Sequence, residues 1–235
     1  MVRRRGFLTL MFGGALWLRG PAGAAPLPDA SSAVRALLID TIASPDKAAR
    51  GRLIAEAEAR ARVMLAQTPD DVPARLLLAL AIGLKARRAK PLEAFRAGWA
   101  QEGKALIESA AHDAPDNAWA QALLGGWHLE VLRRGGPAGG VLLGARESVG
   151  LAAFAHARAL APHDGAIALH YAAALLGYAP QRFAKEAASL LDIALSTGPN
   201  AADFAPPIRA AAAAIRQTLA DKGPAAAKAF VDGLV

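Results

Sequence analysis

Apolar side chains recur at helical spacing along almost the whole chain after residue 32, and no stretch alternates apolar and polar residues as a half-buried strand would. Several of these stretches start at Pro, or just after Asp, Asn or Ser, which suit the first turn of a helix. The pattern predicts an all-α fold. The expected helices are 32–43, 46–67, 73–87, 91–112, 118–133, 145–160, 165–176, 179–197, 202–220 and 224–234.

Four of the expected helices end alike, with small or apolar residues on one face, then a proline, then a polar residue and a new helix. The prolines are Pro69, Pro115, Pro162 and Pro199. Their spacings of 46, 47 and 37 residues leave room for two helices between successive prolines. The chain therefore favours a repeat of helix pairs.

The residue types around these prolines follow a known pattern. Small residues stand five places before three of the prolines, at Ala110, Ala157 and Ala194. Large apolar residues stand eight places before the same prolines, at Ile107, Phe154 and Leu191. The pair Leu124-Gly125 follows the turn at Pro115. The stretch from about 46 to 220 thus resembles the tetratricopeptide repeat, a pair of antiparallel helices about 34 residues long. The first unit departs from the pattern, because Met64 stands at a small position. The alternative is an irregular helical bundle.

This resemblance implies an architecture and a binding surface. The architecture is an α-α superhelix of about four helix pairs plus terminal helices, in one domain spanning 33–235. The implied groove positions are Leu76, Leu80, Leu84, Trp119, Ala122, Leu129, Glu130, Leu169, Ala173 and Leu176. In this register Trp119 faces the groove, whereas in an ordinary bundle it would be a core aromatic.

The implied inner face is almost wholly apolar, which leaves two outcomes. The expected one is that other helices of the chain, the terminal ones above all, cover it. The alternative is an open face that holds an apolar ligand or a partner.

Composition agrees with a folded helical protein. Of the 235 residues, 54% are apolar and 20% are charged, which is ample material for a core. Ala is by far the commonest residue and aromatics make up 6%, a mix that favours helix over strand.

Residues 1–24 have the anatomy of a secretory signal peptide, with a basic start, an apolar run over 7–18 and small residues at 22–24. The apolar run is about 12 residues, short of the roughly 20 that span a bilayer. Arg4, Arg5, Phe7 and Leu8 resemble the twin-arginine export signal. We expect cleavage near Ala24, a linker over 25–32, a periplasmic location and no transmembrane segment in the mature chain; an uncleaved anchor helix is the alternative.

Cleavage would change the charge argument. The signal segment carries four of the 27 basic residues and no acid, so a net charge of +7 would fall to +3. The high net charge is therefore poor evidence for a nucleic-acid partner. The absence of Cys from the sequence excludes disulfides, thiolate metal sites and Cys nucleophiles.

Candidate chemistry along the chain is sparse. His112, His128, His156, His163 and His170 lack the spacing that sets two metal ligands on one helical face. Glu56 and Glu58 stand among Arg residues, as in ordinary i,i+4 pairs. The Gly-rich stretch 133–148 lacks the Gly-Lys-Ser/Thr ending of a phosphate loop; we expect a mobile connection there, with a lid or docking segment as the alternative. No catalytic residue, metal or cofactor is predicted.

These observations favour a non-catalytic periplasmic adaptor that binds another envelope protein or peptide through its stacked helix pairs. The competing hypothesis is a carrier of an apolar small molecule, such as a lipid, held between helices.

Overall fold

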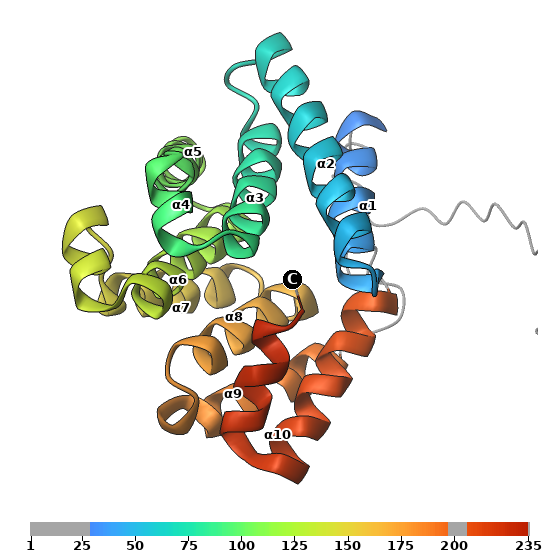
Figure 1. The fold of residues 1–235 in the computed structure, drawn as a ribbon, viewed down its shortest axis with the longest axis vertical. Coiled ribbons are helices and arrows are strands. Elements are labelled where there is room, and N and C mark those ends of the chain that lie inside the picture. Colours follow the sequence, from blue (N-terminus) through green and yellow to red (C-terminus); the bar gives the residue numbers. More distant parts are fainter. Residues whose placement is uncertain (1–28, 197–205, 235) are drawn as a thin grey trace, which may run out of the picture.

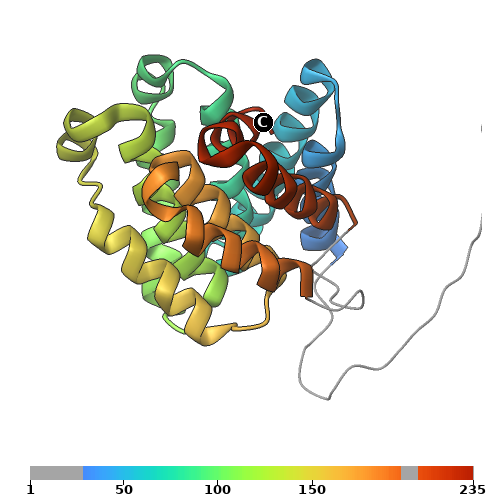
Figure 2. The ribbon, with the colours of Figure 1, turned by 90° about the horizontal axis from the view of Figure 1, so that it is seen from below.

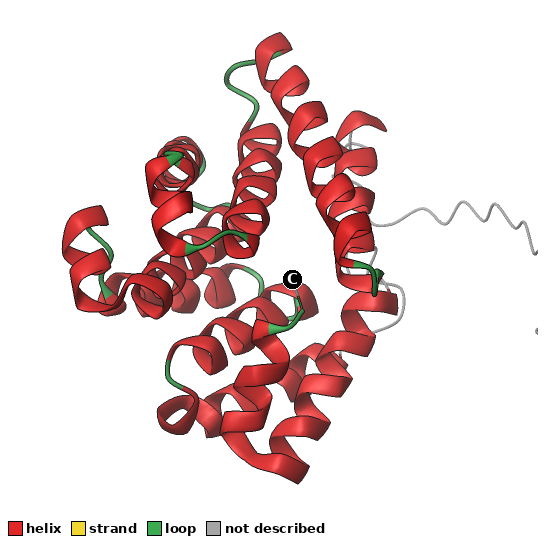
Figure 3. Cartoon of the chain, viewed as in Figure 1, coloured by secondary structure: helices red, strands yellow, loops and turns green. Residues whose placement is uncertain are grey.

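The computed structural model describes residues 29–196 and 206–234 of the chain, and these residues form ten helices (Figures 1 and 3). No strand occurs in these two ranges, so the predicted all-α class is confirmed. The helices are α1 (Asp29–Ala43), α2 (Lys47–Gln67), α3 (Val72–Arg88), α4 (Pro91–Arg96), α5 (Trp99–Asp113), α6 (Ala118–Leu143), α7 (Glu147–Leu160), α8 (Gly165–Tyr178), α9 (Pro180–Ser196) and α10 (Pro206–Asp232).

The helices pack in sequential pairs: α1 with α2, α3 with α5, α6 with α7, and α8 with α9, followed by α10. The first helices of the pairs also touch each other in the order α1, α3, α6, α8 and α10. We call these five helices the inner layer, and we call α2, α5, α7 and α9 the outer helices. This sequential pairing is consistent with the repeat-like arrangement that the proline spacing predicts.

The inner layer closes on itself, because α1 and α10 are in contact although they stand at opposite ends of the chain. Figure 1 shows the C-terminal end of α10 near the middle of the curved array, and Figure 2 shows the same helix beside α1 and α2. The first and last helices are therefore not free ends of an open solenoid.

Three inner helices begin with the same device. Asp71, Asn117 and Asp164 each lie two residues after a turn proline. The side chain of Asp71 accepts from one backbone N–H group of the next turn, and the other two side chains each accept from two. These caps satisfy donors that a helix start leaves free. The repeated proline turn is thus also a repeated helix start.

Several helix boundaries differ from the sequence prediction. Helix α1 begins at Asp29, so the last four residues of the expected linker 25–32 are helical and Ser31 is buried. The expected helix 91–112 is divided into α4 and α5 at Gly98, which has a φ of 75°. Only a residue without Cβ takes this backbone conformation readily.

The Gly-rich stretch is a further correction, because it is ordered as helix and not as a loop. The chain turns at Gly136, whose φ of 58° and ψ of −158° interrupt α6, and then continues in helical turns to Leu143. Gly144, with a φ of 74°, ends the helix in the left-handed conformation. The Nζ of Lys104 donates to the Leu143 carbonyl, and the Arg146 N–H donates to Nδ1 of His128. These two hydrogen bonds hold the C-terminal end of the Gly-rich stretch in place.

Small residues set the spacing of the third pair, α6 and α7. A Cβ added to Gly125 would lie 2.6 Å from Cδ2 of Phe154 and 2.8 Å from the Gly150 carbonyl oxygen. Phe154, itself fully buried, fills the space that the two glycines leave. The paired helices α6 and α7 therefore approach closely at the Leu124-Gly125 position.

The expected signal peptide, residues 1–24, lies outside the described residues. Within the described ranges, none of the helices is both long enough and apolar enough to span a bilayer.

Candidate functional site

The ten predicted groove residues come from α3, α6 and α8, which are neighbours in the inner layer. Half of them are buried: Leu76, Ala122, Leu129, Leu169 and Leu176. The other half are partly exposed: Leu80, Leu84, Trp119, Glu130 and Ala173. The structure therefore places the predicted set in one layer but leaves only part of it accessible.

Helices from both ends of the chain account for much of the burial. Ile39 and Ile42 of α1, and Ala227 and Val231 of α10, belong to the same apolar cluster as Leu129, Leu169 and Leu176. Ala227 is 0% exposed and Val231 is 2% exposed. The expectation that terminal helices cover the apolar inner face agrees with this packing.

Trp119 lies where two parts of the core meet. Its ring packs against the cluster that contains Leu76 and Ile107, and also against the cluster that contains Phe154 and Leu176. It is partly exposed and joins the helix pairs on either side of α6. Its first role is therefore to pack successive pairs together.

A charged cluster interrupts the apolar inner face where α3, α6 and α10 approach each other. The guanidinium of Arg133 donates to both carboxylate oxygens of Glu130, at 2.8 and 2.6 Å, and its remaining Nη1 donates to Asp232 at 2.7 Å. Arg87 of α3 lies 3.4 Å from the same Glu130 carboxylate. We call Arg87, Glu130, Arg133 and Asp232 the inner-face charged cluster.

The cluster has an excess of positive charge that Asp232 reduces. Burial opposes the ionisation of Glu130, but the hydrogen bonds from Arg133 and the charges of Arg87, Arg133 and Arg134 outweigh it and hold the pKa of Glu130 below its ordinary value. Without Asp232, one carboxylate would face three guanidinium groups. The side chains of Arg133 and Glu130 are 17% and 29% exposed, so these charges are only partly screened by water.

Arg134 joins the neighbouring helix in another way. Its guanidinium donates to the carbonyl oxygens of Ala86 and Ala89, at the end of α3. Carbonyl groups at a helix end lack the usual i+4 partner, and a positive charge suits the helix C-terminus. Arg134 therefore positions α3 against α6 and contributes less charge to the open surface.

His170 of α8 lies beside the charged cluster, against α6. A Cβ on Gly126 would come within 2.4 Å of its Nε2, so Gly126 makes room for the ring. This Nε2 atom is buried and has no hydrogen-bond partner among the described residues. Burial and the positive charge of Arg87 lower the pKa of His170 to about 4, against the opposing effects of a backbone hydrogen bond with Ala122 and of Glu130.

Asp232 is the member of this cluster that was not predicted from sequence. Glu130 was found by its groove position, and the spacing of Glu130 and Arg133 is typical of a helical ion pair. No short-range sequence pattern predicts the ion pair between Asp232 and Arg133, because 99 residues separate them. The break before Pro224 was expected, but the course that the chain takes after it is visible only in the fold.

The other candidate chemistry keeps ordinary structural roles. Glu56 pairs with Arg60 and Glu58 with Arg62, each at i,i+4, as predicted. Glu58 also pairs with Lys85 of α3, which links the first two helix pairs. The described ranges contain no group of three or more His, Asp or Glu side chains that could hold a metal ion.

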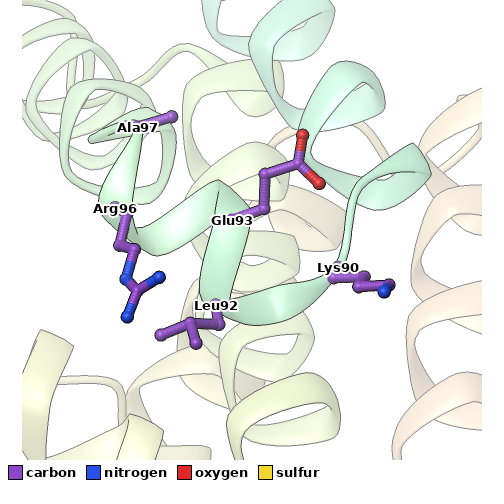
Figure 4. A pocket seen from close by; sticks show the side chains of 5 residues that line it. All are labelled: Lys90, Leu92, Glu93, Arg96 and Ala97. Carbon is purple, nitrogen blue, oxygen red and sulfur yellow. The ribbon is translucent and has the colours of Figure 1, made fainter.

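Two of the hollows on the surface are lined by residues outside the predicted groove set. One, of about 490 Å³, is lined by Lys90, Leu92, Glu93, Arg96 and Ala97 of α4 and its flanks. Figure 4 shows Leu92 and Arg96 extending to one side of α4 and Glu93 to another. The other, of about 400 Å³, lies between α6 and α7 and includes Leu124 and His156.

No protein-family model, curated protein or solved structure matches this chain. Its function must therefore be inferred from its own geometry and sequence pattern. Over the described ranges, the chain is an all-helical domain of ten packed helices whose inner face carries a charged cluster.

Proposed function

We propose that the protein is a non-catalytic adaptor, exported to the periplasm, that binds another envelope protein or peptide through the inner face of a tetratricopeptide-like array. The observation that carries the proposal is the composition of that face. Partly exposed apolar side chains of α3 and α6 lie on the same layer as a charged cluster of Arg87, Glu130 and Arg133. Apolar contact area beside fixed charges is the chemistry of a protein-binding surface.

The helix pairing supports the same proposal. The helices stack in sequential pairs, an arrangement whose helical surfaces repeat proteins use to bind extended or helical segments. The turn prolines and the Leu124-Gly125 position follow the tetratricopeptide pattern, and the glycine is required by the close approach to Phe154. The packing of the apolar inner side chains against α1 and α10 favours this proposal over a lipid carrier.

Site-specific photo-cross-linking in living cells tests the adaptor function. A photoreactive residue at Leu84, which is partly exposed on α3, should cross-link to one envelope protein. The same residue at Ala155, exposed on the outer helix α7, is the matched control and should give no such product. Equal cross-linking from both positions, or none from Leu84, would contradict the proposal.

Leu84 is a better probe than the more central positions of the predicted groove. Leu129 is 1% exposed, so a polar or bulky replacement there would test folding and not binding. A Leu84→Asp variant should lose the partner while keeping its helical circular dichroism.

Export has its own test. Replacing Arg4 and Arg5 with Lys should keep the protein out of the periplasmic fraction if it uses the twin-arginine route. Unchanged appearance in that fraction would exclude this route and leave the adaptor proposal standing.

A further inference from the structure

The end of the chain occupies the inner face as a separate short helix. At Gly223 the backbone takes φ 79° and ψ 179°, a conformation essentially restricted to glycine, and Pro224 begins a new helical segment. Ala227, Val231 and Leu234 of this part of the chain pack into the apolar cluster that also holds side chains of α8 and α1. We call residues 224–234 the C-terminal segment.

This segment contacts the inner face like a bound ligand helix. Ala227 and Val231 stand four residues apart on one side of it and are both buried. Asp232 follows directly and receives Arg133 at 2.7 Å and Lys228 at 2.6 Å. The Nη1 of Arg50 donates to the Gly233 carbonyl at 3.3 Å. A helix that lays an apolar side into a groove, with a charge fixing its register, is a recurring mode of peptide recognition.

The C-terminal segment makes few buried contacts, so another helix could take its place on the inner face. Only two of its side chains are buried to 2% or less, the Asp232 side chain is 35% exposed, and the ring of Phe230 is turned toward solvent at 37%. Ion pairs this exposed contribute little by themselves. The segment is tethered, which gives it a high effective concentration at the site without requiring tight contacts.

We propose that the C-terminal segment is an internal competitor for the partner's binding site, and that the partner's ligand is a short amphipathic helix with a carboxylate. The expected pattern is a small residue, an aliphatic residue four places later, and Asp or Glu directly after it, as in Ala227, Val231 and Asp232. The carboxylate pairs with Arg133 in place of Asp232. This inference rests on the proposed adaptor function and names the class of its partner.

A charge exchange in the full chain tests the competition. In Asp232→Arg, the segment places a positive charge against Arg133 and should leave the inner face. A fluorescent synthetic peptide of residues 222–235 should then bind this variant at least tenfold more tightly than it binds the wild type, as measured by fluorescence anisotropy. The same peptide with Arg in place of Asp232 is the control and should bind neither protein.

A second substitution shows whether the peptide uses the proposed site. Adding Arg133→Glu to Asp232→Arg restores the internal ion pair with its charges reversed, so the segment should return and peptide binding should be lost. Peptide binding that is equal in the wild type and Asp232→Arg, or unaffected by Arg133→Glu, would overturn the proposal. Helical circular dichroism of each variant verifies that it folds.

If Asp232→Arg does not fold, distance measurements on a spin-labelled chain that keeps Asp232 test the same competition. The sequence has no Cys, so cysteines introduced at the exposed positions Ala229 and Arg52 can carry spin labels without competing thiols. Excess peptide should add a second, longer distance between the labels. A single unchanged distance at saturating peptide would also overturn the proposal.

These results are separable from the adaptor test. Cross-linking at Leu84 without peptide binding would support the adaptor function and contradict the internal competition. Peptide binding without cross-linking would support a helix-binding site and contradict binding to an envelope protein.

Discussion

At the scale of single residues, the fold depends on where side chains are absent as much as on where they are present. Gly125 and Gly150 let α6 and α7 approach, and Gly126 makes room for His170. Gly83, in the middle of α3, has open space around its Cβ position instead. The same residue type therefore has opposite consequences in two inner helices.

We expect Gly125→Ala to destabilise the protein by about 1–2 kcal/mol, because the cost of overpacking exceeds the roughly 1 kcal/mol gained from helix propensity. Gly83→Ala is the matched control and should stabilise by about 0.5–1 kcal/mol. Urea unfolding followed by circular dichroism measures both. Equal effects of the two substitutions would show that close packing at Gly125 is unimportant.

His170 makes stability depend on pH in a definite direction. Its pKa is about 4 in the folded protein against 6.5 in a free side chain, so the unfolded chain takes up the proton first. The contribution of neutral His170 to the free energy of unfolding is fully present above pH 6.5. It is lost as the pH falls toward 4, by up to about 3 kcal/mol. His170→Gln should flatten the fall in unfolding free energy over this range, measured by urea unfolding at several pH values. Parallel curves for the two proteins would contradict this assignment.

At the scale of elements, helix starts are specified locally and helix ends are less so. Asn117 caps α6 by accepting from the N–H groups of Trp119 and Ala120. The acceptor is the side-chain oxygen of Asn117 and not that of the neighbouring Asp116. The end of α6 was predicted near residue 133, but the helix resumes after the bend at Gly136 because Lys104 and His128 hold its last turns.

Asn117→Ala should cost about 1 kcal/mol of unfolding free energy, the usual value of a helix N-cap. The neighbouring Asp116→Ala is the control and should lie within about 0.5 kcal/mol of the wild type, as exposed surface substitutions do. Chemical denaturation of the two variants decides between the two capping residues. A larger loss for Asp116→Ala would reverse the assignment.

At the scale of the whole molecule, the contact between α1 and α10 joins the two ends of the array. A linear array transmits stability only between neighbouring units. Here Ile39 and Ile42 of α1 share an apolar cluster with Val231, so a change near the C-terminus reaches the first helix directly. The ends should therefore be protected together.

We expect Val231→Ala to accelerate amide hydrogen exchange in α1 more than in α7, although α7 is far closer in sequence. Val231 is 2% exposed, and its truncation leaves a cavity in the shared cluster. Val63→Ala, at a position 57% exposed, is the control and should leave exchange in α1 unchanged. Exchange that rises in α9 and α10 alone would show that the ends are independent.

The helical class, the paired organisation and the caps could be predicted from the amino-acid sequence, because apolar spacing, proline turns and N-cap residues act within a few positions of the chain. Tertiary packing was needed to settle how much of the inner face is exposed, how the Gly-rich stretch is ordered, and which charges meet. The pairing of Arg133 with Asp232 depends on the bend at Gly223 and on the closure of α10 against α1. Such contacts come from the packing of distant segments, which no local pattern of residues encodes.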